Sequence, residues 1–170
     1  IAEKGLVVFD AKVTGTPGHA AHKNDDNAIY ISAEMNDPDP KNIPSEFAVR
    51  DNFGIADFFL VTINPNDDGQ NPFEFIVQTT GNQIDAKISN GDEDMDWSAV
   101  WQSAAKITAN GWNVEMEIPY RALRFANRPV QSWGFNFHRR LEKLNEQSNG
   151  QEFNIHLSSL EDDKTVKYQI

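Results

Sequence analysis

The stretch that decides the fold reads GWNVEMEIPYRALRF at residues 111–125 and WGFNFHRRL at residues 133–141. Within residues 112–118 every second side chain is apolar, and residues 133–140 repeat this alternation with aromatic rings. Successive side chains of a β-strand point to opposite faces of a sheet, so a period of two predicts half-buried strands. Pro119 ends the first strand, because proline cannot donate a ladder hydrogen bond. We therefore expect two strands that share an aromatic core.

Composition excludes several classes of protein. The chain has 170 residues, a formal net charge of −11 and no cysteine. An acidic chain lacks the Lys/Arg patches that nucleic acid requires, and it is not suited to an anionic membrane surface. Without cysteine it has no disulfide, no thiolate nucleophile and no Cys-based zinc site. No apolar run approaches the roughly 20 residues of a membrane span, so we expect no direct membrane insertion.

The remaining sequence predicts short strands separated by turns rich in Gly, Pro, Asn and Asp. Residues 57–64 (DFFLVTIN) are apolar on both faces, which predicts a central strand. Residues 97–107 fit either a helix or a strand, and the turn TANG that follows favours a strand for the second half. A single helical turn is expected within residues 120–125. Further strands are expected at residues 5–13, 28–35, 73–79, 83–88, 152–157 and in the tail.

These elements predict an all-β fold, an antiparallel β-sandwich of jelly-roll type. The length fits one domain over residues 1–170. The chain begins IAEKGLVVFD, without a recognisable signal peptide, which indicates a domain excised from a larger protein.

Several motifs resemble the family 9 carbohydrate-binding modules, especially a variant at the N-terminus of bacterial proteins that continue into an outer-membrane-like region. The segments that carry the resemblance are AIYISAEMNDPDP, DFFLVTIN, FEFIVQTTGNQIDA, DWSAVWQSAAKITANGWNVEMEIPYRALRF and WGFNFHRR. They lie within residues 28–157, and residues 1–27 match poorly. The resemblance implies a non-catalytic β-sandwich attached to a larger protein, often a glycoside hydrolase. It also implies a bacterial protein that is secreted, periplasmic or associated with the outer membrane.

The resemblance also implies where a sugar would bind. Sugar-binding members hold a pyranose between two tryptophans, one of which precedes the acidic residue that opens the strand at residues 57–64. The nearest aromatic residue here is Phe53, and no tryptophan follows Trp133. A phenylalanine ring can still stack on a sugar, because such contact needs an aromatic face. Arg50 and Asp57 flank Phe53, and we expect them to contact the ligand; a structural ion pair is the alternative.

A polar sheet face is the second source of candidate residues. Alternation places Glu117, Asn136, His138 and Arg140 opposite the aromatic core, where their side chains could hydrogen-bond sugar hydroxyls. The alternative is a solvated face with weak cross-strand ion pairs. Trp97 and Trp101 flank an acidic loop, and either a stacking or a core position fits them. The predicted carbohydrate-binding residues are therefore Arg50, Phe53, Asp57, Trp97, Trp101, Glu117, Asn136, His138 and Arg140.

Two acidic loops are candidates for calcium, which takes six to eight oxygen ligands. Asp67 and Asp68 lie in one loop, and Asp92 and Asp94 lie in the other. Neither loop fits the EF-hand pattern, and both can be solvated turns. Calcium is the one metal cofactor that the sequence suggests.

Catalytic motifs are absent from the sequence. Glu115 and Glu117 would lie roughly 6–7 Å apart along one strand, a separation that overlaps those of glycosidase carboxylates. Because nothing else supports an acid/base pair, we expect a non-catalytic module.

The leading hypothesis is a module that binds a mono- or oligosaccharide, or the end of a glycan chain, for an attached protein. One alternative is a structural domain that has lost sugar binding and docks onto the C-terminal domain of the same polypeptide. The other is a sandwich that holds haem between a methionine and a histidine or lysine. Its candidate ligands are Met35, Met95, Met116 and His138.

Overall fold

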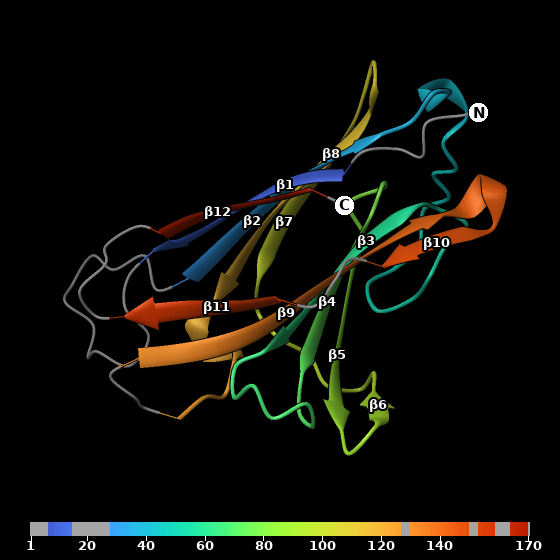
Figure 1. Cartoon of the computed structure of the whole chain (residues 1–170). Coiled ribbons are helices and arrows are strands. Elements are labelled where there is room, and N and C mark those ends of the chain that lie inside the picture. Colours follow the sequence, from blue (N-terminus) through green and yellow to red (C-terminus); the bar gives the residue numbers. More distant parts are fainter. Residues whose placement is uncertain (1–6, 15–27, 127–129, 150–152, 159–163, 170) are drawn as a thin grey trace.

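The computed structural model describes residues 7–14, 28–126, 130–149, 153–158 and 164–169. Within them the chain forms two antiparallel β-sheets, which face each other as the layers of a sandwich (Figure 1). The predicted antiparallel β-sandwich is confirmed, whereas its jelly-roll connectivity and the single-domain boundary stay predictions.

The first sheet has the strand order β12-β1-β2-β8-β7, and each neighbouring pair is antiparallel. Its long central strands, β2 and β8, carry the alternating apolar side chains that the sequence predicted. The strands are β1 (Val7–Thr14), β2 (Ala28–Asn36), β7 (Gln102–Thr108), β8 (Gly111–Pro119) and β12 (Lys164–Gln169).

The second sheet has the order β10-β9-β3-β4-β5-β6, and β11 pairs with the other part of β9. Its strands are β3 (Phe58–Asn64), β4 (Phe73–Gln78), β5 (Gln83–Ser89), β6 (Asp92–Asp94), β9 (Val130–Leu141), β10 (Glu146–Asn149) and β11 (Phe153–Ser158). Three single 3-10 turns complete the described structure: η1 (Pro40–Asn42), η2 (Tyr120–Ala122) and η3 (Glu142–Leu144).

The element predictions agree with this structure in most places. Strand β3 lies between β9 and β4, so its predicted central position is confirmed. The ambiguous residues 97–107 contain no helix, and β7 occupies their second half. The turn TANG joins β7 to β8, as predicted, with Thr108 opposite Gly111. Residues 90–96 were predicted as a loop, but they also form β6, which pairs with β5.

Gly111 begins β8 at a place where the backbone of β2 comes very close. A Cβ atom at this position would lie 1.9 Å from the carbonyl oxygen of Met35, and φ is 148°. Only glycine fits so close an approach between two paired strands.

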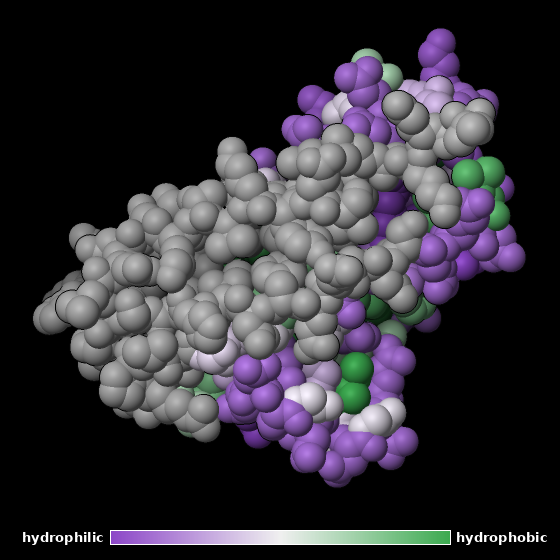
Figure 2. All heavy atoms as spheres, in the orientation of Figure 1, coloured by the Kyte–Doolittle hydropathy of each residue, from purple (hydrophilic) through white to green (hydrophobic). Residues whose placement is uncertain are grey.

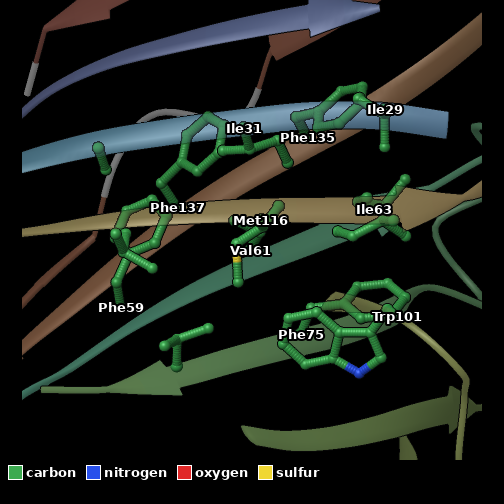
Figure 3. Close-up of a cluster of buried hydrophobic side chains, with 14 of the residues drawn as sticks. Ile29, Ile31, Phe59, Val61, Ile63, Phe75, Trp101, Met116, Phe135 and Phe137 are labelled. Carbon is green, nitrogen blue, oxygen red and sulfur yellow. The ribbon is translucent and has the colours of Figure 1, made fainter. Parts of the chain in front are cut away.

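The core lies between the two sheets and is rich in aromatic rings (Figure 3). Strands β2 and β8 contribute aliphatic side chains such as Ile31 and Met116, and β3 and β9 contribute Phe59 and Phe137. The last two rings are stacked, with centroids 5.8 Å apart. Interlocking of side chains from both sheets fixes how the layers face each other.

Replacement of Phe59 by alanine tests this core. The ring of Phe59 is fully buried, whereas that of Phe47 is 81% exposed. We expect Phe59→Ala to lower the free energy of unfolding by about 3–5 kcal/mol, through lost burial and a residual cavity. Phe47→Ala is the matched control and should cost much less. Urea denaturation followed by tryptophan fluorescence measures both, and equal losses would contradict the described core.

Candidate functional site

The outer face of the second sheet carries three of the nine candidate binding residues. In the β3–β9 pairing, Phe58 lies opposite Arg140, Leu60 opposite His138 and Thr62 opposite Asn136. These residues alternate with the buried ones that face the core, so they share the face turned away from it. The structure therefore brings together three predicted residues, Asn136, His138 and Arg140.

Three rings form a row at one end of this face, and we call Phe53, Phe58 and His138 the ring row. The centroids of Phe53 and Phe58 are 5.6 Å apart and their planes are tilted by 56°. Those of Phe58 and His138 are 5.7 Å apart and nearly parallel, at 15°. Phe53 is 53% exposed. An exposed aromatic face at the end of such a row is a surface on which a sugar ring can stack.

Phe58 was not predicted as part of a site. The sequence placed it in a strand that is apolar on both faces, which hid its outward orientation. The signal was present, because Phe58 is out of phase with the buried Phe59 and Val61.

Polar groups adjoin the ring row. Arg140 donates to Glu142 Oε2 from Nε, at 2.9 Å, and to Asn145 Oδ1 from Nη2, at 2.6 Å. These bonds fix the guanidinium group of Arg140, which is the cross-strand neighbour of Phe58. Asn136 Oδ1 is buried and has no hydrogen-bond partner in the described part of the chain. A ring platform near a fixed guanidinium group can both stack on a sugar and hydrogen-bond its hydroxyls.

Glu74 lies on the same outer face, opposite Thr62. Burial raises the pKa of the Glu74 carboxyl above its ordinary value of 4.5, and the negative charge of Glu93 raises it further. The hydroxyl of Thr62, 3.4 Å away, donates to Glu74 and partly opposes the shift.

The loop that carries Phe53 is fixed by Arg50. The guanidinium group of Arg50 donates to Asp85, to Gln83 and to the carbonyl oxygen of Ala99. Burial raises the pKa of Asp85, while the backbone N–H of Ala99 and the charge of Arg50 oppose this shift. Arg50 thus forms the structural ion pair that the sequence left as an alternative.

Gln78, from β4, holds the same loop at the residue that follows Phe53. Its side chain donates to the carbonyl oxygen of Gly54 at 3.0 Å and accepts from the N–H of Gly54 at 3.2 Å. The loop therefore presents Phe53 on a fixed backbone.

Asp57 lies inside the protein rather than at the ring row. It is fully buried, and Oδ1 accepts a hydrogen bond from the N–H of Glu142 at 2.8 Å. Burial raises the pKa of Asp57, and this hydrogen bond together with the charge of Arg139 opposes the shift.

The two candidate tryptophans pack against the core. Trp101 is buried and meets Phe75 edge to face, with centroids 5.3 Å apart. Trp97 is partly buried, and its ring lies 5.1 Å from that of Phe73. The sequence allowed either a stacking or a core position for these two tryptophans, and both occupy core positions.

Glu117 lies on the other sheet. It belongs to β8, between Tyr30 of β2 and Gln102 of β7. Its side chain points away from the core between the two sheets. Glu117 is therefore on the opposite side of the sandwich from the ring row. The structure does not bring Glu117 together with Asn136, His138 and Arg140.

In the two acidic loops, Asp68 and Asp94 hydrogen-bond backbone N–H groups of the same turn. Asp68 accepts hydrogen bonds from the N–H of Gln70, at 2.9 Å, and from that of Asn71, at 3.3 Å. Asp94 accepts from the N–H of Asp96 at 3.1 Å. Among the residues that the structure describes, no group of three or more His, Asp or Glu side chains is arranged to hold a metal ion. Asp67 and Asp92 likewise belong to no such group, so calcium binding stays a prediction.

The methionine and histidine proposed for haem are also separated. Met35 and Met116 are buried between the sheets, whereas His138 lies on the outer face of the second sheet. A haem iron between Met116 and His138 would have to lie within β9 itself. The positions of Met35, Met116 and His138 therefore do not form a haem site, and a site that uses Met95 stays a prediction.

Comparison with known proteins identifies a structural neighbour. The crystal structure of a "putative carbohydrate-binding protein" from Bacteroides uniformis ATCC 8492 matches with a TM-score of 0.55 and 11% sequence identity. The match covers 83% of this chain and 73% of the other. At this identity the likeness shows a shared fold. No protein-family model matches the chain, and the search of curated proteins finds no relative.

Replacement of Glu74 by glutamine tests the electrostatics of the outer face. A carboxyl whose pKa is higher in the folded state stabilises the fold less as the pH rises through that pKa. Relative to wild type, Glu74→Gln should therefore gain unfolding free energy as the pH rises above the ordinary glutamate pKa of about 4. Urea denaturation at several pH values measures the difference. The exposed Glu115→Gln, which removes the same charge, is the control, and an identical pH dependence in both variants would contradict the assignment.

Proposed function

We propose that the protein is a non-catalytic carbohydrate-binding module whose sugar stacks on the ring row. The observation that carries this proposal is the exposed ring of Phe53, which neighbours Phe58 and, through it, His138. Arg140, whose guanidinium group is fixed, is the cross-strand neighbour of Phe58. Aromatic faces contact the C–H groups of a pyranose, and the neighbouring polar groups bind its hydroxyls. The name of the structural neighbour, which refers to carbohydrate binding, supports the same class of function.

The finer features of the proposal rest on the resemblance to family 9 modules. They are a mono- or oligosaccharide ligand, such as a chain end, and attachment to a larger bacterial protein of the glycoside hydrolase class. The corresponding location is secreted, periplasmic or outer-membrane-associated. None of the helices in the described ranges has the length and hydropathy of a membrane span.

Docking onto the C-terminal domain of the same polypeptide is the second candidate function. The described surface seen in Figure 2 is largely hydrophilic, with small separate apolar areas. Against this background, Phe47 and Val49 stand out, at 81% and 70% exposed, and both lie on the loop that Arg50 fixes. Large apolar side chains held in exposed positions favour a contact with another protein surface.

Calorimetry and thermal shift against a panel of mono-, di- and oligosaccharides, with and without calcium, test the proposal. A sugar present at about 100 times its Kd should add roughly 2.7 kcal/mol to the unfolding free energy. We expect Phe53→Ala to weaken binding about tenfold, the loss that corresponds to one aromatic stacking contact. Phe47→Ala removes an exposed ring from the same loop, lies outside the ring row and should leave binding unchanged.

The outcomes separate the two candidate functions. Equal affinity of wild type and Phe53→Ala for a bound sugar would rule out the ring row as the site. Binding of no sugar in the panel, with or without calcium, would overturn the proposal in favour of docking.

A further inference from the structure

Arg139 is a buried cation without a direct hydrogen-bond partner among the residues that the structure describes. Alternation along β9 turns its side chain toward the core, in phase with Phe135 and Phe137, and it lies opposite Phe59. It is 2% exposed, and none of its three guanidinium nitrogens has a hydrogen-bond partner in the described part of the chain. A buried charged group that lacks hydrogen bonds is costly, so native proteins satisfy such groups with protein atoms, water or a ligand.

Two buried carboxylates, Asp37 and Asp57, are each only half satisfied. Asp57 uses Oδ1 for the N–H of Glu142, and Asp37 uses Oδ1 for the N–H of Asp39 and the ammonium group of Lys143. In both residues Oδ2 is buried and has no hydrogen-bond partner within the described ranges. We call Asp37, Asp57 and Arg139 the buried polar cluster.

The three side chains are electrostatic neighbours. Burial lowers the pKa of Arg139, and the charges of Asp57 and Asp37 both oppose that shift. The guanidinium nitrogens and the free carboxylate oxygens nevertheless make no direct hydrogen bond. The register places Arg139 opposite Phe59, two residues after Asp57. Glu142 and Lys143, just beyond the end of β9, bind Asp57 and Asp37, so the three side chains lie at the same end of β9.

The chemistry of the cluster selects the group that can bridge it. The guanidinium nitrogens require an acceptor, whereas the free carboxylate oxygens require a donor. An anion would be repelled by Asp37 and Asp57, and a cation would be repelled by Arg139 and Lys143. A hydroxyl group satisfies both sides, because it accepts through its oxygen and donates through its hydrogen.

We propose that Asp37, Asp57 and Arg139 form a buried binding site for hydroxyl groups, supplied by water or by a polyol. Water is the smaller source, and buried waters ordinarily make two to four such hydrogen bonds. A polyol would include the hydroxyls of a sugar. In that case the cluster would give the bound sugar a second contact. The existence of the site does not depend on the proposed function.

Access to the buried polar cluster is controlled by Lys143. Its ammonium group donates to Asp37 Oδ1 at 2.6 Å and to the carbonyl oxygen of Asp39 at 3.1 Å. These bonds join η3, which contains Lys143, to the turn that precedes η1. The side chain of Lys143 is partly exposed, whereas the cluster is buried. A hydroxyl in the cluster should therefore exchange slowly with solvent, and loss of the lysine should speed exchange.

Oxygen-17 magnetic relaxation dispersion tests the site, because it detects water molecules that remain bound longer than the protein takes to rotate. We expect the wild type to hold at least one such water that Arg139→Met lacks. Lys106→Met is the matched control, since Lys106 is exposed on the first sheet. It should leave the dispersion unchanged.

A second variant keeps the test decisive if Arg139→Met does not fold. Lys143→Met retains the cluster but removes its contact with Asp37, so we expect the same water to exchange faster. A dispersion that neither variant changes would overturn the proposal. Added glycerol distinguishes the two sources: loss of the slow water would assign the hydroxyl to a polyol, and its persistence would assign it to water.

Discussion

The pairing register of β3 and β9 is the constraint on which the rest of the structure depends. With Phe59 opposite Arg139 and Val61 opposite Phe137, one set of side chains fills the core. The alternate set, which includes Phe58 and His138, is turned to the outer face. A slip of one residue would exchange the two sets along either strand. Burial of the phenylalanine rings therefore fixes the core and the candidate site together.

Most of the fold could be predicted from the sequence because its signals are local. The alternation in residues 112–118 and 133–140 predicted β8 and β9, and Pro119 predicted where β8 stops. Residues 97–107 stayed ambiguous because two tryptophans with helical spacing precede the alternating part. Packing determines the conformation here, because Trp97 and Trp101 both contact rings of β4 from a segment that is not helical. Strand β6 was missed because its three acidic residues have a composition typical of a loop.

The candidate site was only partly predictable, because alternation assigns a side chain to a face but does not assign a strand to a sheet. Glu117 and His138 both alternate with core residues, yet they belong to different sheets and lie on opposite sides of the sandwich. Long-range pairs are hidden for the same reason. Arg50 and Asp85 are 35 positions apart, and only the folded chain shows that they meet. Arg139 did carry a signal, because it is in phase with the aromatic residues of its strand.

Strand β7 is an edge strand of the first sheet, and an edge strand can pair with a strand of a second molecule. One side of β7 pairs with β8, so the backbone groups on its other side are not part of the ladder of this sheet. Such an edge is a template for another strand, and charged residues near it discourage that association. The sequence QSAAKIT places small residues along the edge and one lysine, Lys106, among them. That charge, together with the repulsion between chains that each carry −11, opposes extension of the sheet into a second molecule.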